Sequence, residues 1–410
     1  MFNFSFLGQQ LPQPLKSLIF SFSLLYFIYY FNFFWLIQNV YILSHHVSYT
    51  QLSLLLIIWS LTIIILEIPS GIVADKFGRK PVIVLAKLSF LLGIVLFYVF
   101  PSLWGFCLGV IAFGLHEAFI SGAQESLLFD NLKDYQHEHL FGKLMALATT
   151  CREIGLGTGV LLAGFITNIK IEYNLIGSIV IAILGFFIAL TLTESKFRSR
   201  SEEINFFHNF NSAFKKIFKD LNLARIVFFG ATVLVAYQII SEYFVVSLKE
   251  LQLSFISVGF LALAESLFFS LGSFLSQKIK LLGERKIYVA LSLGMALLMA
   301  FISLGKVYSV IIGFLILRTL KAIGEIVSVN DWQKHVQSHE RATTISVNSF
   351  AKNMTYIVFA FLFGKIADNF GLFRGFYLSA GLAVSYIIVA IVLALVHGKN
   401  KPTPLGKIAG

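Results

Sequence analysis

Long apolar segments alternate with short polar connections along almost the whole chain. Twelve of these segments are long enough to cross the ~30 Å of hydrocarbon in a bilayer. They cover residues 17–43, 52–74, 81–100, 102–128, 140–168 and 175–194, and then 224–248, 252–277, 286–304, 307–331, 342–367 and 375–397. The pattern predicts an all-α membrane protein with twelve transmembrane helices.

A longer polar stretch at 195–223 separates the first six segments from the last six. We therefore expect an N-terminal six-helix bundle at 1–194, a cytoplasmic linker at 195–223, a C-terminal six-helix bundle at 224–398 and a cytoplasmic tail at 399–410. In the linker, Ser199 and Glu202 have the spacing of a capping box, and apolar residues from Phe207 to Leu221 recur at helical spacing. This predicts an amphipathic helix on the membrane surface, with a plain connection between the bundles as the alternative.

Composition and charge agree with a membrane protein. Of the 410 residues, 57% are hydrophobic and 13% are charged, which is roughly half the charged fraction of a soluble domain. The net charge of +11 would fit nucleic-acid binding, but the basic residues gather in alternate connections instead. With both termini in the cytoplasm, the outer connections hold few of them: Lys170, Lys249, Lys306, Lys365 and Arg374. The distribution predicts cytoplasmic termini in a plasma (inner) membrane and excludes nucleic acid as a partner.

The sequence has few features of metal or catalytic chemistry. Its two cysteines, Cys107 and Cys151, both lie in apolar segments and form neither a metal-ligand spacing nor a disulfide framework. It also lacks a nucleophile elbow and a phosphate-binding loop, which disfavours a polytopic enzyme. We therefore expect no metal, no cofactor and no catalytic residue.

Polar residues within the apolar segments gather on the first, fourth, seventh and tenth. In each segment they recur three or four residues apart, so they share one face of a helix. The four sets are Tyr29, Asn32, Trp35 and Asn39; Gly114, Glu117, Ser121, Gln124 and Glu125; Tyr237, Gln238, Ser241 and Glu242; and Arg318, Lys321, Glu325 and Ser328. Polar groups in hydrocarbon face a cavity or one another. We predict a central polar cavity between two pseudo-symmetric bundles, with structural ion pairs as the alternative for any single residue.

The substrate cavity is predicted to contain polar residues from both halves. They are Asn32, Asn39, Glu117, Gln124, Arg152, Gln238, Glu242, Arg318, Lys321 and Lys352. Glu117, near the middle of the membrane with Arg152 as its nearby cation, is the predicted proton carrier, and Glu242 and Glu265 are its rivals. Glu325 is expected to hold Lys321 while Arg318 stays free for ligand.

Two further residues have structural interpretations. His116 has apolar helical neighbours, so we predict a packed histidine rather than a ligand or proton relay. Apart from Glu194 and Lys286 at segment ends, Lys87 is the only Lys, Arg, Asp or Glu in the third, sixth, ninth and twelfth segments. We expect it to extend toward the membrane surface, as lysines near a helix end do.

One connection carries a specific motif. Residues 71–80, GIVADKFGRK, resemble the G-x-x-x-D-[RK]-x-G-[RK]-[RK] signature that follows the second helix in the major facilitator superfamily. A degenerate copy at 272–286, GSFLSQKIKLLGERK, is two residues longer and lacks the acid, and the end of the eleventh segment, FGKIADNFG at 363–371, also resembles the family pattern. With the twelve segments, the resemblance covers nearly the whole chain. It implies that family's fold and a secondary active transporter.

The resemblance also implies a conformational lock on the cytoplasmic side. Gly71 and Gly78 would allow a close backbone approach and a tight turn. By resemblance, Asp75 lies against the N-terminus of the eleventh helix near Ala342, where exposed N–H groups favour an anion. Arg79 would pair with Asp130 at the end of the fourth helix.

Direction and substrate stay open in the sequence. The stretch GLGTGVLLAG at 155–164 keeps glycines of the antiporter pattern but has Val160 and Ala163 where the pattern has proline and glycine, and helix packing explains the glycines equally well. The leading hypothesis is a proton-coupled transporter, functional as a monomer, that exports a small organic solute. The alternatives are a nutrient or organic-anion importer of the same fold, and a lipid flippase.

Overall fold

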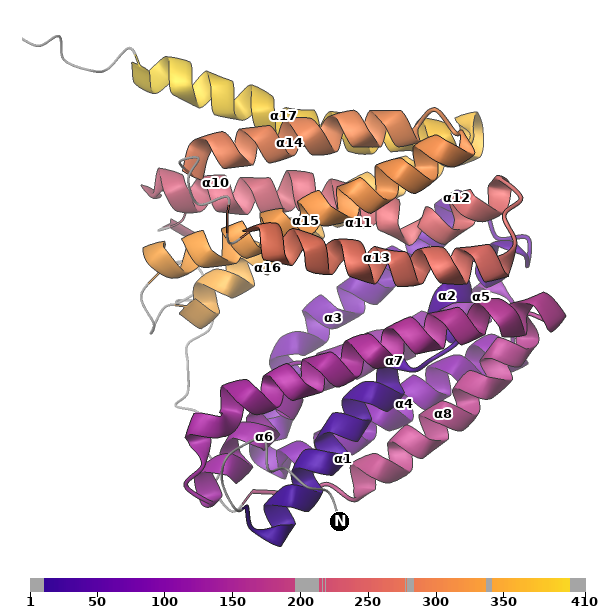
Figure 1. Cartoon of the computed structure of the whole chain (residues 1–410), viewed down its shortest axis with the longest axis vertical. Coiled ribbons are helices and arrows are strands. Elements are labelled where there is room, and N and C mark those ends of the chain that lie inside the picture. Colours follow the sequence, from indigo (N-terminus) through magenta and orange to yellow (C-terminus); the bar gives the residue numbers. More distant parts are fainter. Residues whose placement is uncertain are drawn as a thin grey trace, which may run out of the picture.

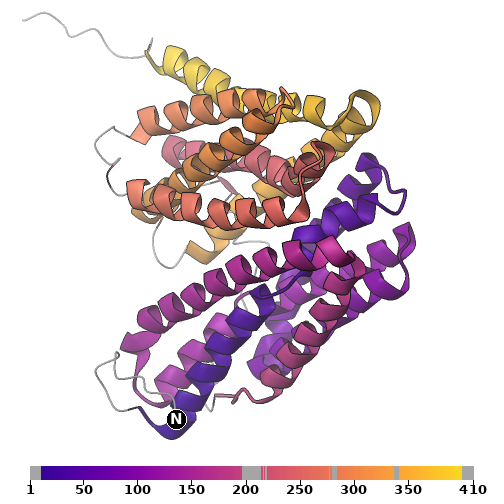
Figure 2. The same ribbon diagram turned by 45° about the vertical axis from the view of Figure 1, so that its right-hand side comes forward.

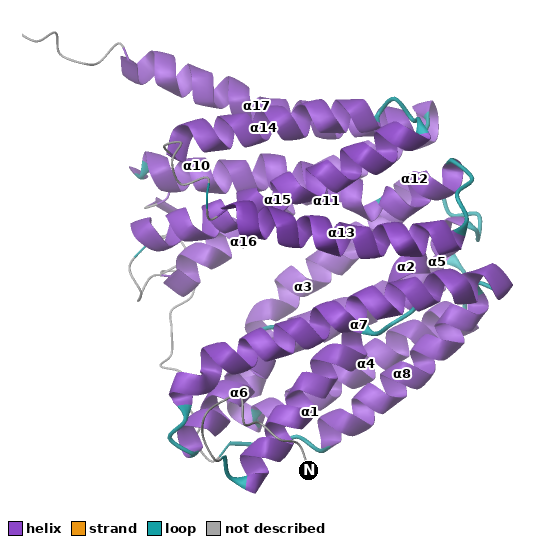
Figure 3. Ribbon diagram, in the orientation of Figure 1, coloured by secondary structure: helices purple, strands orange, loops and turns teal. Residues whose placement is uncertain are grey.

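The computed structural model describes residues 11–195, 214–276 without 216 and 218, 278, 284–336 and 341–398. Within these ranges the regular elements are all helices (Figure 3). Nine helical segments of the described chain are long and apolar enough to cross a membrane. The linker helix predicted from residues 199–221 falls largely on 196–213, and the tail on 399–410, so both lie outside the described residues.

The helices form two sets along the chain. The first set contains α1 (Gln13–Tyr30), α2 (Phe34–Leu43), α3 (Tyr49–Phe77), α4 (Arg79–Val99), α5 (Leu103–Ile120), α6 (Ala123–Asp134), the short η2 (Glu138–Leu140), α7 (Phe141–Ile169) and α8 (Glu172–Leu190). The second contains α10 (Leu221–Phe229), the π-helical turn η3 (Gly230–Leu234), α11 (Val235–Glu242), α12 (Phe244–Glu250), α13 (Phe255–Ser276), α14 (Glu284–Ile302), α15 (Val307–His335), α16 (Arg341–Phe370) and α17 (Leu372–Gly398). The predicted segments correspond to these helices, with ends that differ by a few residues.

Three predicted segments are interrupted. The first breaks at 31–33, where the buried Asn32 side chain accepts a hydrogen bond from the backbone N–H of Phe34 (2.9 Å) and so competes with a continuous helix. The fourth breaks at Ser121 and Gly122, where Gly122 has a φ of +73° that glycine adopts without steric cost. The seventh contains the π-helical turn η3, a feature that often marks a functional region.

The two sets lie side by side and touch through a few helix pairs (Figure 1). We call the face where α1 begins and α17 ends the terminal face, and the other the opposite face (Figure 1). The main contacts between the sets join α7 to α13 and α3 to α16, and α2 also touches α12. The sets lie close together at the opposite face and diverge toward the terminal face (Figures 1 and 2).

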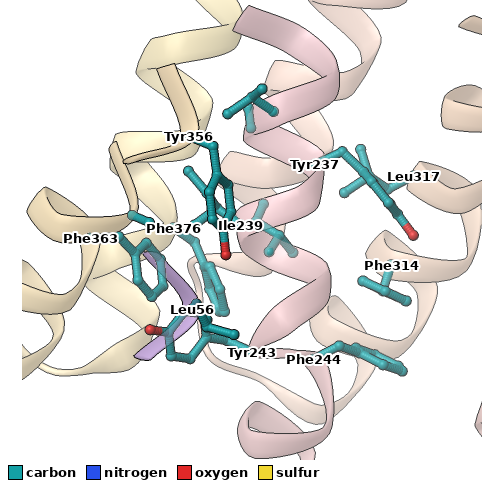
Figure 4. Packing of buried hydrophobic residues seen from close by; sticks show 14 of the residues in the cluster. Leu56, Tyr237, Ile239, Tyr243, Phe244, Phe314, Leu317, Tyr356, Phe363 and Phe376 are labelled. Atoms are coloured by element: carbon teal, nitrogen blue, oxygen red, sulfur yellow. The ribbon is translucent and has the colours of Figure 1, made fainter. Parts of the chain in front are cut away.

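Buried aromatic residues fill the contact between α3 and the second set near the opposite face. The rings of Tyr243 and Phe363 lie 4.5 Å apart, and Phe363 also packs on Phe376. Leu56 of α3 lies beside Tyr243 and Phe363 (Figure 4). These side chains come from both sets, so this contact closes the opposite face with a packed apolar layer.

Candidate substrate cavity and coupling site

A cavity of about 340 Å³ lies in the first set, between α1, α4, α5, α6 and α7. Its wall combines aromatic, acidic and basic side chains, including Tyr29, Lys87, Glu117, Gln124 and Arg152. Ser121 and Gly122, at the break between α5 and α6, also line it. The break therefore exposes backbone and small side chains to the cavity where a continuous helix was expected.

Glu117 is held by a phenol in the cavity wall. The Tyr29 hydroxyl donates a hydrogen bond to the Glu117 carboxylate at 2.6 Å. The Tyr29 ring packs against His116 and Phe90, with centroid separations of 4.6 and 4.9 Å. This packing fixes the phenol, so Glu117 sits in a defined position between the cavity and the core.

Lys87 differs from its prediction. Its side chain does not reach the membrane surface: the residue is only 4% exposed and its ammonium lies 4.3 Å from the centroid of the Tyr29 ring. It interacts electrostatically with Glu117 and lines the same cavity. A cation–π contact and a nearby carboxylate compensate for the lost hydration of the ammonium. Lys87 is thus a cavity residue that the sequence analysis missed.

His116 is a packed residue, as predicted. It is fully buried, and its Nδ1 lies 2.8 Å from the carbonyl oxygen of Ala86 on α4. This hydrogen bond joins α5 to α4 directly behind Glu117. His116 therefore supports the Tyr29 and Glu117 arrangement through packing.

Arg152 lines this cavity of the first set, and it has its own acidic partner. Its guanidinium binds the carboxylate of Glu153 at 2.7 Å and lies 5.6 Å from the centroid of the Tyr30 ring. The cation that interacts with Glu117 is Lys87, on the helix that faces it. The expectation that Arg152 would serve as the cation of Glu117 is therefore corrected.

A second charged cluster lies on α11, α13 and α15. Lys321 binds Glu325 at 2.7 Å one helical turn away, which confirms the predicted pair. Arg318 is not free: its Nε lies 3.1 Å from Glu265, and its Nη1 donates to the Tyr237 hydroxyl at 3.0 Å. The prediction was wrong because Glu265 is on another helix, and its orientation cannot be read from spacing along α15.

Lys352 and Asn348 of α16 lie against the π-helical turn η3. A Cβ atom built on Gly230 would come within 2.6 Å of Lys352 Cε and 3.5 Å of Asn348 Oδ1. Asn348 Oδ1 is buried and has no hydrogen-bond donor in the part of the chain that the structure describes. The absence of a side chain at Gly230 thus leaves room for two polar groups of α16.

Four other predicted cavity residues lie elsewhere: Asn32, Asn39, Gln238 and Glu242. Asn32 is fully buried, and its side chain accepts a hydrogen bond from the backbone N–H of Phe34 at the start of α2. Asn39 donates from Nδ2 to the backbone carbonyl of Glu242 at 2.7 Å. Asn39 and Glu242 therefore connect the two sets at the opposite face, outside the wall of the cavity described above. Gln238 is half-buried on α11, also outside that wall.

The contact expected between Arg79 and Asp130 is present. The Arg79 guanidinium lies 3.1 Å from the Asp130 carboxylate, which joins the start of α4 to the end of α6. Gly78 forms the predicted tight turn with a φ of +99°. Glu194 adds a contact that the sequence analysis missed, since its carboxylate accepts hydrogen bonds from the backbone N–H groups of Arg79 (3.0 Å) and Lys80 (2.7 Å). Glu194 thus supplies the acceptors that the first amides of α4 lack within their own helix.

The close approach expected at Gly71 is absent here. A Cβ atom built on Gly71 would meet nothing within 4 Å, so no backbone in the described part of the chain packs against it. The partner predicted for Asp75 lies near Ala342, whose side chain is outside the described residues. That contact stays a prediction.

The family model of the Major Facilitator Superfamily matches residues 18–328. The chain belongs to this superfamily. A curated relative, an MFS-type transporter of Bacillus subtilis (strain 168) called YxaM and described as uncharacterized, is 26% identical over 382 residues, covering 88% of this chain and 91% of that protein. Its printed name gives no substrate.

Solved structures of other transporters share the fold of this superfamily member at low sequence identity. A variant of the nucleoside transporter NupG has a TM-score of 0.77 at 12% identity, with 93% of this chain and 100% of that chain covered. A bacterial homologue of the human lysosomal transporter Spinster, in an inward-facing conformation, has a TM-score of 0.74 at 14% identity, with 97% and 100% covered. A D-xylose–proton symporter has a TM-score of 0.66 at 14% identity, with 92% and 96% covered.

Proposed function

We propose that this superfamily member is a proton-coupled secondary transporter that exports a small organic solute by alternating access. The observation that carries the proposal is the Tyr29–Glu117–Lys87 cluster in the wall of the cavity. It places one carboxyl group, one phenol donor and one cation together at the surface of a space large enough for a small solute.

The cluster has the properties of a proton-coupling site. While Lys87 lies close by, its charge stabilises the Glu117 carboxylate in a region with little water. If a helix movement separates the two groups, the buried Glu117 carboxylate loses its nearby cation, its charged form becomes costly, and it binds a proton instead. Glu117 lies on α5 and Lys87 on α4, so a change in the packing of these helices alters their distance. This gives proton binding a direct link to conformation.

The proposed topology has twelve spans in two bundles of six, both termini in the cytoplasm and no requirement for a second copy. Besides the nine helical segments selected by length and composition, α7, α14 and α15 complete this number. The helices α7 and α15 carry Arg152, Arg318 and Lys321, and such charges lower mean hydropathy without preventing insertion when they face a protein interior. The terminal face is then the cytoplasmic face.

The lining of the cavity favours a solute with both an apolar and a charged part. Tyr26, Tyr29 and Tyr30 supply ring surfaces, and the charged lining residues carry both signs: Lys87, Arg152, Glu117 and Glu125. The neighbouring structures are named as transporters of nucleosides and of D-xylose with protons, which supports a small polar or amphipathic solute.

Export rests on the partial antiporter pattern at 155–164. Gly155 and Gly159 lie directly against the backbone of residues 27–32, where a Cβ on Gly155 would come within 2.4 Å of the Phe27 carbonyl oxygen. A rigid contact between α7 and the broken first span would transmit movement between them. Import of a nutrient or organic anion, and lipid transfer, are the alternatives.

Purified protein in proteoliposomes tests the proposal. Solutes that raise its melting temperature in a panel of nucleosides, sugars, dipeptides and amphipathic ions become the transport probes, because bound ligand stabilises the folded state. Glu117→Gln is expected to abolish transport driven by a pH gradient and to retain counterflow of the same probe. The matched control is Glu125→Gln, an exposed acid on the rim of the same cavity, which is expected to retain both activities. Full gradient-driven transport by Glu117→Gln would contradict the proposal, and transfer of a fluorescent lipid without solute transport would favour the flippase.

A further inference from the structure

The ends of α3 and α16 have closely similar sequences. Residues 71–78 read GIVADKFG and residues 364–371 read GKIADNFG. Gly78 and Gly371 both have a left-handed φ, of +99° and +93°. Their N–H groups donate to the carbonyl oxygens of Ala74 and Ala367, at 3.0 and 2.9 Å. The same motif therefore ends both helices in the same geometry, one at the terminal face and one at the opposite face.

The motif of α16 binds the start of α3. The Asp368 carboxylate accepts hydrogen bonds from the backbone N–H groups of Tyr49 (2.8 Å) and Thr50 (2.9 Å), the first two residues of α3. These amides lack partners within their own helix, and the N-terminal end of a helix attracts negative charge. Asp368 thus connects the second set of helices to the first through a charge-assisted cap.

Gly364 allows this contact. A Cβ atom at this position would come within 2.5 Å of Ser53 Oγ and 2.8 Å of Thr50 Cα and the Tyr49 carbonyl oxygen. A Cβ atom at Gly71, the matching residue of α3, would meet none of the residues that the structure describes within 4 Å. The two copies of the motif are therefore in different states: backbone packs tightly on the glycine at the opposite face and not on the glycine at the terminal face.

Neighbouring contacts also join α3 to the second set at the opposite face, along a line that we call the seam. Ser53 Oγ lies 2.8 Å from the Tyr243 hydroxyl, and the Tyr49 hydroxyl bonds to Glu250. Leu56 and Phe363 pack beside Tyr243 (Figure 4). The Ser53–Tyr243 and Tyr49–Glu250 bonds, and the packing of Leu56 on the second set, would have to separate if the opposite face opened.

We propose that Asp368 and Asp75 form two reciprocal latches between α3 and α16. The two helices run antiparallel, so the N-terminus of each lies at the face where the motif of the other ends. Asp368 caps α3 when the protein is open at the terminal face, and Asp75 caps α16 when it is open at the opposite face. Only one latch is closed at a time. Each cap therefore stabilises one conformation of the two sets at the expense of the other. This inference rests on the alternating access of the proposed function and not on its coupling ion or direction.

Cysteine accessibility tests the latches without a substrate or a pH gradient. In a background with Cys107 and Cys151 replaced by alanine, one reporter is Leu56→Cys, buried in the seam at the opposite face, and the other is Ser121→Cys, exposed in the cavity wall. Asp368→Ala is expected to raise the maleimide labelling rate of Leu56→Cys and lower that of Ser121→Cys by about 2- to 30-fold, the range for loss of a helix cap. Asp75→Ala is expected to shift both rates the other way, and the double variant is expected to return toward the parent.

Matched controls lie next to each aspartate. Asn369→Ala removes a side chain that donates to its own helix, at the Lys365 carbonyl, and Lys76→Ala removes the neighbour of Asp75. Neither is expected to change the labelling ratio. The methyl group of Gly364→Ala would collide with α3, so this variant is expected to shift labelling in the same direction as Asp368→Ala. It provides a second test if Asp368→Ala is too unstable to purify. Unchanged labelling in both α16 variants, or a shift in the direction of Asp75→Ala, would overturn the proposal and leave proton coupling at Glu117 untouched.

Discussion

The hydroxyl of Tyr29 on α1 donates a hydrogen bond of 2.6 Å to the carboxylate of Glu117 on α5. The bond joins two helices that are both broken close to this point, at 31–33 and at 121–122. Any rearrangement at these breaks changes the geometry between the phenol and the carboxylate. Movement of the broken spans would therefore change the hydrogen bond between Tyr29 and Glu117.

Tyr29→Phe is expected to reduce gradient-driven transport by roughly 10-fold or more while leaving counterflow nearly intact. A hydrogen bond to a charged group contributes about 1.5–3 kcal/mol, and phenylalanine keeps the ring that packs on His116 and Lys87. The measurement compares both transport modes in proteoliposomes. Tyr30→Phe is the matched control, because Tyr30 lines the same cavity but the Glu117 bond belongs to Tyr29. Equal loss of both modes in Tyr29→Phe would show that the phenol binds solute and does not position the carboxyl group.

Lys87→Gln is expected to make stability depend on pH. Lys87 is the cation that interacts with the buried Glu117 carboxylate, and a buried carboxylate without a compensating charge destabilises the fold as long as it stays ionised. At pH 8 the variant should therefore melt at a lower temperature than the parent, and at pH 5.5, where Glu117 can take up a proton, the difference should shrink. Adding Glu117→Gln removes the unpaired charge and should restore stability at pH 8.

Lys80→Gln provides the control for loss of a lysine, because Lys80 lies on the same helix outside the cavity. It is expected to melt like the parent at both pH values. If Lys87→Gln and the double variant melt alike at pH 8, Lys87 does not stabilise the Glu117 carboxylate.

Local interactions were predictable from the sequence, and interactions between distant helices mostly were not. Lys321 and Glu325 are four residues apart on one helix, so their contact follows from helical geometry alone. The Arg79–Asp130 pair was predictable only because a family motif related the two positions. The partners Lys87 with Tyr29, and Arg318 with Glu265, depend on how each helix is rotated about its axis, which the apolar pattern of a membrane span specifies weakly.

The breaks in the helices were missed for a different reason. Asn32 and Gly122 lie within long apolar stretches, and hydropathy alone predicts that such stretches continue as helices. The competing local interactions, a side-chain bond to Phe34 and a left-handed glycine, become visible only in the backbone. Both breaks lie next to the cavity region, and departures from regular structure are expected at functional sites.

Arg318 and Glu265 are expected to depend on each other energetically. Arg318→Lys should lower the melting temperature, because a lysine cannot reach both Glu265 and the Tyr237 hydroxyl with the planar fork of arginine. A double-mutant cycle with Arg318→Lys and Glu265→Gln should give a coupling free energy of roughly 0.5–3 kcal/mol. The same cycle with Glu325→Gln in place of Glu265→Gln serves as the comparison, since Glu325 binds Lys321. Strictly additive effects for Arg318 and Glu265 would indicate that Arg318 is available for solute, as the sequence had predicted.

Gly230→Ala tests whether Lys352 contacts the solute. The added methyl group would lie 2.6 Å from Lys352 Cε, so the lysine side chain must move away from the π-helical turn. Because the far end of a lysine is flexible, the fold should tolerate the change, and the main effect should be a displaced ammonium group.

If Lys352 binds an anionic part of the solute, Gly230→Ala should raise the apparent KM several-fold with little change in kcat, and Lys352→Gln should do the same. Gly324→Ala is the control for a small residue in the second set, because its methyl group would approach the Phe229 ring at 3.1 Å and not a charged side chain. An unchanged KM in both Gly230→Ala and Lys352→Gln would assign Lys352 to the packing between α16 and the π-helical turn.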